Sequence, residues 1–139
     1  MIRILTSFCL VAAGFGPLLL DIGDTHLFNP DWDEHSRVHE VWRLSTNVLI
    51  GILGLYLIWY KNKNLLPAML SSCLIIGFLI SVITMPLYDG LSVGNGITEL
   101  SPYGIPMNIF SFLIVGLLQF ISIVSVSYTH LTLPTILLV

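Results

Sequence analysis

Apolar residues fall into four long runs along this 139-residue chain, with a polar connection after each of the first three. The runs cover residues 4–22, 41–60, 65–88 and 105–126. A bilayer core of about 30 Å needs about 20 helical residues, and three runs reach that length outright, while the first does so if Ile22 is drawn in. Because no backbone N–H group can be left unpaired in lipid, the runs are predicted to be helical although Ile, Val and Thr are frequent. The pattern predicts an all-α fold, an integral membrane four-helix bundle.

Composition supports lipid as the main solvent of this chain. Hydrophobic residues make up 55% of it and charged residues 9%, and the net charge of −3 excludes the basic surface typical of nucleic-acid binding. Such a composition also excludes disorder, which requires low hydrophobicity. Cys9 and Cys73 lie within apolar runs without metal-ligand spacing, so we expect both to be small buried hydrophobic residues.

The two ends of the chain each have a second interpretation. Arg3, the apolar stretch after it and the small residues 11–13 resemble a signal peptide, although hydrophobicity continues to Leu20, which favours a membrane span. From about Val126 onward the sequence resembles translated sequencing-adapter DNA. We therefore expect residues 127–139 to be a non-native tail, and His130 is left out of the site.

Small and polar residues within the runs predict how the helices pack. Small residues let neighbouring helices approach closely, either inside the bundle or between copies in a homo-oligomer, although Gly and Ser are also simply common in membrane helices. These small residues are Gly14, Gly16, Gly51, Gly54, Ser71, Ser72, Gly77 and Ser81. Asn47, Asn108 and Gln119 are expected to hydrogen-bond across helices in the interior. No charged residue lies near the middle of a span, which argues against an ion channel or a proton-coupled transporter.

The charges predict an orientation. All eight carboxylates lie in or beside the connections after the first and third spans, which share one side of the membrane. The opposite side has three basic residues, Arg3, Lys61 and Lys63, against Arg37 and Arg43 on the acidic side. The positive-inside rule therefore favours a cytoplasmic N-terminus.

Residues 21–43, here called the rim segment, concentrate the candidate chemistry. They contain six of the eight acidic residues and three of the four histidines. Asn29-Pro30 should end any helix continuing from the first span. The second helix is then expected to begin near Asp31 or Asp33, either of which suits the N-cap, with Glu34 in its first turn.

Three interpretations of the rim histidines stay open. His35 and His39 are four residues apart on one helical face, with Arg43 next in the row, and with His26 they are candidate ligands for Zn or another divalent metal. Asp24, Asp31 or Glu40 are candidates to complete such a site. Alternatively, the histidines are solvated, Glu40 pairs with Arg37 or Arg43, and Trp32 and Trp42 anchor the interface. Proton transfer or pH sensing by ordinary histidines is the third interpretation.

The rim segment also resembles a known signature. The sequence Thr25-His26-Leu27-Phe28-Asn29-Pro30-Asp31-Trp32, followed by His35 and His39, is similar to a motif of a small four-helix membrane-protein family of fungi and bacteria, a domain of unknown function. The match covers about 25 residues closely. Asp33-Glu34 stand where the family has two prolines, and Val41-Trp42 depart where its Gln is usual. The resemblance implies four helices and a functional loop containing the candidate site residues His26, Asn29, Trp32, His35, His39 and Glu40, and it implies no reaction.

The connection between the third and fourth spans, residues 89–106, is rich in Gly, Pro, Ser and Asn, with a turn expected at Asn95-Gly96. It is either an ordinary exposed loop or a lid over the rim segment that contributes Asp89 and Glu99.

Two functions follow from these patterns. One is a non-catalytic multi-pass membrane protein that packs, binds lipid or binds a partner. The alternative is a small membrane metalloenzyme or metal-binding protein that acts at the lipid–water interface on a lipid or sterol-like substrate. Membrane diiron enzymes with similar histidine spacing need about eight histidines, so that class is excluded.

Overall fold

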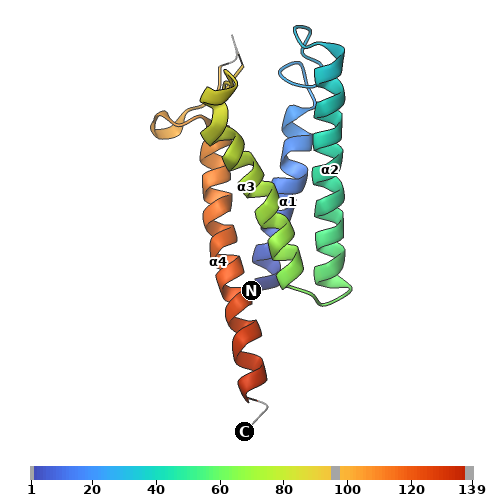
Figure 1. Ribbon diagram of the computed structural model, residues 1–139, viewed down its shortest axis with the longest axis vertical. Coiled ribbons are helices and arrows are strands. Elements are labelled where there is room, and N and C mark those ends of the chain that lie inside the picture. The colour runs from blue at the N-terminus through green and yellow to red at the C-terminus, as the bar shows by residue number, and fades with distance from the viewer. Residues whose placement is uncertain (1, 95–97, 137–139) are drawn as a thin grey trace.

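The predicted all-α fold is confirmed. The computed structural model describes residues 2–94 and 98–136, with side chains as far as residue 128. It has four long helices, α1 (Ile2–Asp21), α2 (Glu34–Trp59), α3 (Leu65–Thr84) and α4 (Met107–Ile136), and the described residues contain no strand (Figure 1). All four helices are long and apolar enough to span a membrane. The chain therefore has the architecture of a multi-pass membrane protein.

Successive helices run in opposite directions. The α1–α2 and α3–α4 connections lie at one end of the bundle and the α2–α3 turn lies at the other (Figure 1). Both α1 and α3 pack against all three other helices, so these two form the centre of the bundle. One core cluster joins Cys9 and Ala13 of α1 with Ile75 of α3.

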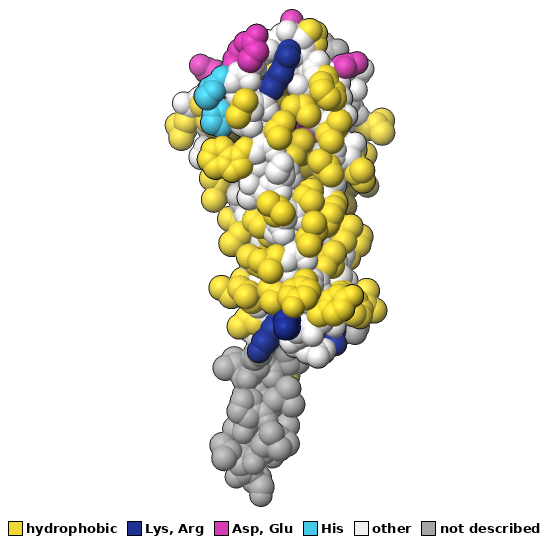
Figure 2. All heavy atoms as spheres, turned by 90° about the vertical axis from the view of Figure 1, so that its right-hand side faces the viewer, with side chains coloured by type: hydrophobic (Ala, Val, Ile, Leu, Met, Phe, Trp, Pro, Cys, Tyr) yellow, Lys and Arg dark blue, Asp and Glu magenta, His cyan; other side chains and the backbone are white. Residues whose placement is uncertain are grey.

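Charged side chains lie at the two ends of the bundle. On the face drawn in Figure 2, acidic and histidine side chains gather at one end, basic side chains dominate the other, and a wide hydrophobic band lies between them. This separation matches the shared side predicted for the two acidic connections. It leaves the middle of the bundle free to contact hydrocarbon.

The close contact between α1 and α2 depends on glycine. A Cβ atom added to Gly14 would lie 3.1 Å from the Asn47 carbonyl oxygen and 3.2 Å from the Gly51 Cα atom. At Gly51 it would lie 2.7 Å from the Phe15 ring, and at Gly54 2.6 Å from Leu10. The predicted small-residue contact is thus confirmed for these glycines. Within the bundle no such contact forms at Gly16 or Gly77, where an added Cβ atom would have no atom within 4 Å.

Polar groups at membrane depth join the helices. The Gln119 side-chain amide donates to the Ala68 carbonyl oxygen at 2.6 Å and to Ser72 Oγ at 3.0 Å, which links α4 to α3 as predicted. Thr6 and Ser122 share a buried hydrogen bond of 2.6 Å between α1 and α4. Such bonds each contribute about 1 kcal/mol in a membrane.

The expectations for Asn108 and for one of the two cysteines need correction. Asn108 lies at the start of α4, where its amide donates to the Ser92 carbonyl oxygen of the preceding connection rather than to another helix. Cys9 is buried as expected, whereas Cys73 is exposed on the outer face of α3.

The second helix begins at Glu34, as expected from a cap at Asp33, so it includes the polar part of the rim segment. The end of the third run is a 3₁₀ turn, η1 (Met85–Leu87), and a second one, η2 (Pro102–Gly104), interrupts the α3–α4 connection. In the predicted tail the backbone stays helical to Ile136, while the Asn95-Gly96 turn and residues 137–139 lie outside the described residues.

Candidate functional site at the acidic end

The loop after α1 is held by its own backbone. The Leu27 N–H group donates to the Asp21 carbonyl oxygen at 3.1 Å, and the Phe28 N–H group donates to the Gly23 carbonyl oxygen at 2.9 Å. Asn29 Oδ1 then accepts from the Asp31 N–H group at 2.9 Å, which forms an Asx turn across Pro30. α1 has already ended at Asp21, so no helix reaches Asn29-Pro30, and the Asx turn there separates the loop from the start of α2.

Asp33 caps α2, which confirms one of the two predicted caps. Its carboxylate accepts from the Ser36 backbone N–H group at 2.9 Å and from the Ser36 hydroxyl group at 2.7 Å. These hydrogen bonds favour the ionised form and hold the pKa of Asp33 below its ordinary value. Glu34 occupies the first turn, where a negative charge complements the helix dipole.

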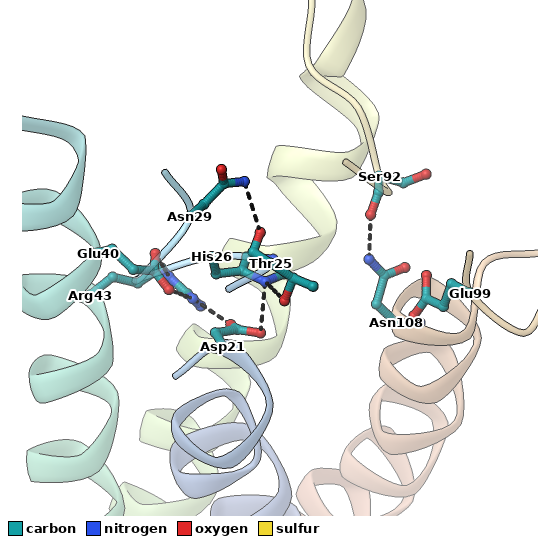
Figure 3. A network of polar contacts seen from close by, with 9 residues as sticks. All are labelled: Asp21, Thr25, His26, Asn29, Glu40, Arg43, Ser92, Glu99 and Asn108. Atoms are coloured by element: carbon teal, nitrogen blue, oxygen red, sulfur yellow. Dashed lines mark hydrogen bonds and ion pairs between the residues drawn. The ribbon is translucent and has the colours of Figure 1, made fainter. Parts of the chain in front are cut away.

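Arg43 joins two carboxylates at the rim of the bundle. Its Nε atom donates to Glu40 Oε2 at 3.0 Å, its Nη2 atom also contacts Glu40 Oε1, and Nη2 lies 2.5 Å from Asp21 Oδ2. Figure 3 shows the guanidinium group between the two acids. Glu40 is only 8% exposed, so this pairing satisfies a buried charge. The network connects the end of α1 to the second and third turns of α2.

His26 lies in the loop beside the same network. Its Nδ1 atom is 3.0 Å from Thr25 Oγ1 and 3.9 Å from Asp21 Oδ1, and its ring is 6.0 Å from that of Trp32 in an edge arrangement. Asp21 therefore lies between a histidine and an arginine.

His35 and His39 form a separate pair on the exposed face of α2. Their Nε2 atoms lie 3.0 Å apart, and their rings are nearly perpendicular with centroids 4.5 Å apart. The His39 ring also stacks on Trp42 with a centroid distance of 6.1 Å. The one-face arrangement predicted for these two histidines is confirmed.

The structure does not join all six candidate residues in one site. Over residues 2–94 and 98–128, no group of three or more His, Cys, Asp or Glu side chains is positioned to share a metal ion. His26 contacts Asp21, whereas His35 and His39 contact each other. Arg43 does not extend the histidine row, because it turns toward Glu40 and Asp21. The solvated interpretation predicted that Glu40 pairs with Arg37 or Arg43, and the structure shows the pair with Arg43.

Two contacts of the rim were not predicted from the sequence. Asp21 ends α1 and pairs with a residue 22 positions later, a contact that no local spacing reveals. Arg37 donates from Nη2 to the Asn29 carbonyl oxygen at 3.0 Å and so holds the loop against α2. A basic residue on the inner face of α2, four positions after the cap, was the available signal for this second contact.

The α3–α4 connection satisfies its own polar groups. Glu99 Oε1 accepts from the Asn108 N–H group at 3.0 Å, which caps the start of α4. Asp89 lies in an open groove at the end of α3, whose lining includes none of the histidines. Within the described residues, no hydrogen bond or ion pair joins Asp89 or Glu99 to the rim segment. These two side chains therefore give no support to the lid hypothesis.

Comparison with known proteins assigns no relative. No family model, no curated protein sequence and no solved structure matches this chain.

Proposed function

We propose that this chain is a non-catalytic multi-pass membrane protein whose rim segment binds lipid headgroups on the non-cytoplasmic side. The observation that carries this proposal is the composition of the rim surface. Phe28, Val38 and Trp42 are each at least 60% exposed, and they lie among the charged residues of the rim. Aromatic and aliphatic side chains beside charges are typical of contact with the headgroup region.

The internal pairing of the rim acids supports a binding role over a catalytic one. Glu40 and Asp21 both form ion pairs with Arg43, and Asp33 caps α2. Carboxylates committed to structural contacts are poorly placed to act as general bases. What remains for a ligand is the exposed surface of the loop and of the first turns of α2.

The orientation within this proposal follows from the basic residues. Arg3, Lys61 and Lys63 lie at the end opposite the rim, which the positive-inside rule places in the cytoplasm. Labelling with a membrane-impermeant maleimide tests this orientation. In a chain in which Cys9 and Cys73 are replaced by Ser, Asp24→Cys should react in intact cells and Lys61→Cys only after permeabilisation. Reaction of both, or the reverse order, would overturn the orientation.

Headgroup contact is tested through Trp42. With Trp32 and Trp59 replaced by Phe, Trp42 fluorescence in reconstituted vesicles should be quenched strongly by lipids carrying a nitroxide on the headgroup and weakly by lipids carrying it at the acyl terminus. Stronger quenching by the acyl-terminal label would place Trp42 too deep for the proposed contact. No quenching by either label would show that Trp42 does not contact lipid at all.

One observation favours a catalytic alternative at the same rim. His26 is 43% exposed by side chain and lies beside Asp21, a carboxylate that can orient an imidazole for proton transfer. This alternative predicts that membranes expressing the wild-type chain contain a modified lipid or sterol-like alcohol that is missing with His26→Asn. Identical lipid profiles would leave the non-catalytic proposal standing.

A further inference from the structure

His35 and His39 present two ring nitrogens toward one point on the outer surface of α2. Both residues are exposed, and their Nε2 atoms lie 3.0 Å apart. Without an ion, one neutral imidazole donates its N–H group to the lone pair of the other. One proton is then shared between the two Nε2 atoms. A metal cation that accepts a lone pair from each nitrogen can take the place of this proton.

The nitrogen separation suits a transition-metal ion. At metal–nitrogen distances of about 2.0–2.1 Å, two imidazole nitrogens on one ion lie about 2.9–3.4 Å apart for coordination angles of about 90–109°. The observed separation lies within this range, so chelation needs little movement of either ring. Residues spaced by four in a helix also keep both side chains on one face without backbone change.

The surrounding charge favours a cation. Four carboxylates of the rim segment form no ion pair among the described residues, namely Asp24, Asp31, Asp33 and Glu34. They lie in the loop before α2 and at its first residues. Negative charge at this end raises the local concentration of divalent ions over the pair.

From this geometry we propose that His35 and His39 form a two-histidine site for a late first-row divalent metal ion such as Ni²⁺, Cu²⁺ or Zn²⁺. The site does not include His26, which lies in the separate contact with Asp21 and Thr25. Two protein ligands leave the other coordination positions to water, so the bound ion is exchangeable and open to a further ligand from solution. This inference goes beyond headgroup binding and does not depend on which side of the membrane the rim faces.

Trp42 provides a built-in reporter for the site. Its ring stacks on His39 at 6.1 Å, so a paramagnetic ion bound to His39 should quench Trp42 fluorescence. The full chain is purified in detergent through a tag without histidine and titrated with Ni²⁺, which avoids the preference of copper for thiols. Equilibrium dialysis counts the bound ions independently of the optical signal.

We expect one Ni²⁺ per chain and saturable quenching. His35→Ala and His39→Ala should each raise the Kd at least about tenfold, because each removes one of two ligands, while His26→Ala should leave it unchanged. Trp42→Phe should lose the quenching and keep the ion in dialysis. Helical circular dichroism confirms that each variant is folded.

Three results would overturn the site. They are the absence of saturable Ni²⁺ binding by the wild-type chain, an unchanged Kd in either alanine variant of the pair, and a comparable loss in His26→Ala, which would point to a three-histidine site formed by loop rearrangement. None of these results bears on the quenching of Trp42 by labelled lipids, so the headgroup proposal is tested separately.

Discussion

Arg43 and Asp21 lie 22 residues apart in the chain, and the guanidinium Nη2 atom contacts the Asp21 carboxylate at 2.5 Å. The same guanidinium group also pairs with Glu40 one turn earlier on α2. One side chain therefore fixes the position of two helix ends at the acidic end of the bundle. Removal of the Arg43 side chain should therefore lower the stability of the fold more than removal of any other surface charge at this end.

Arg43→Ala is expected to destabilise the folded chain by about 1–3 kcal/mol, because it leaves the buried Glu40 carboxylate without its cation. Because the Arg43 side chain is 41% exposed, water screens its charge, and the loss of stability is smaller than for a fully buried pair. Thermal unfolding in detergent measures the effect. Asp24→Ala, at an exposed acid of the α1–α2 loop that forms no ion pair within the described part of the chain, is the matched control and should change little. Equal melting temperatures for the two variants would show that the network carries no stability.

Gly14 and Gly16 provide a paired test of helix packing. Gly14→Val should destabilise the bundle by about 1–3 kcal/mol, because the atoms that a side chain would meet belong to the backbone of α2 and cannot rotate away. Gly16→Val adds the same side chain to the same helix where there is open space, so its stability should stay near that of the wild-type chain. Equal effects of the two substitutions would contradict the close contact at Gly14.

Gln119→Leu should lower stability by about 0.5–2 kcal/mol, since it removes the two hydrogen bonds that connect α4 to α3. Ser125→Ala is the control on the same helix, because the Ser125 hydroxyl group donates only to the Ile121 carbonyl oxygen within α4. Chemical denaturation in mixed micelles compares the two. If Gln119→Leu left the stability unchanged, apolar packing alone would hold the two helices together.

Asp33 predicts a pH dependence at the start of α2. Because its folded pKa lies below the ordinary value, its cap stabilises the folded state fully at neutral pH and loses that contribution as the pH falls through about 4 toward the folded pKa. Asp33→Asn keeps a capping side chain that does not titrate. The melting temperature of the wild-type chain should therefore fall more than that of Asp33→Asn between about pH 6 and pH 3. Parallel curves would contradict the prediction.

The outer face of α3 predicts how two copies meet. Cys73 and Gly77 are exposed one turn apart, and Gly77 has open space around it. If copies associate through this face, mild oxidation with iodine in membranes should produce a disulfide-linked dimer through Cys73. Gly77→Leu should reduce the yield several-fold, whereas Cys73→Ser should abolish it, since Cys9 is buried. A chain that stays monomeric under oxidation would exclude this interface.

Much of the architecture was predictable because lipid imposes simple rules. Runs of apolar residues as long as a bilayer core fixed the number of helices, and Asn29-Pro30 with the acidic cap at Asp33 fixed the start of α2. Spacing of four was enough to place His35 beside His39. These are all local relationships, determined by the period of a helix and by the chemistry of its ends.

The rest of the rim depended on tertiary contacts. Asp21 meets Arg43 only because α1 and α2 are antiparallel and close, a geometry set by Gly14 and Gly51. The same packing places His26 over Asp21 and separates it from the His35–His39 pair, so the expected three-histidine group does not form. Sequence spacing does not specify which of several nearby acids an arginine selects, or which loop histidine reaches which helix face.

The buried hydrogen bond between Thr6 and Ser122 has a consequence for biogenesis. Its partners are separated by 116 positions, so the Thr6 hydroxyl group, which also donates to the Ile2 carbonyl oxygen within α1, meets Ser122 only after α2, α3 and the first half of α4 have been synthesised. During that interval α1 has only α2 and α3 as neighbours, and the ring of helices stays open on one side. Closure is thus delayed until α4 inserts, and a ribosome that stalls before Ser122 would leave α1 without its α4 neighbour and the otherwise buried Thr6 side chain exposed to lipid.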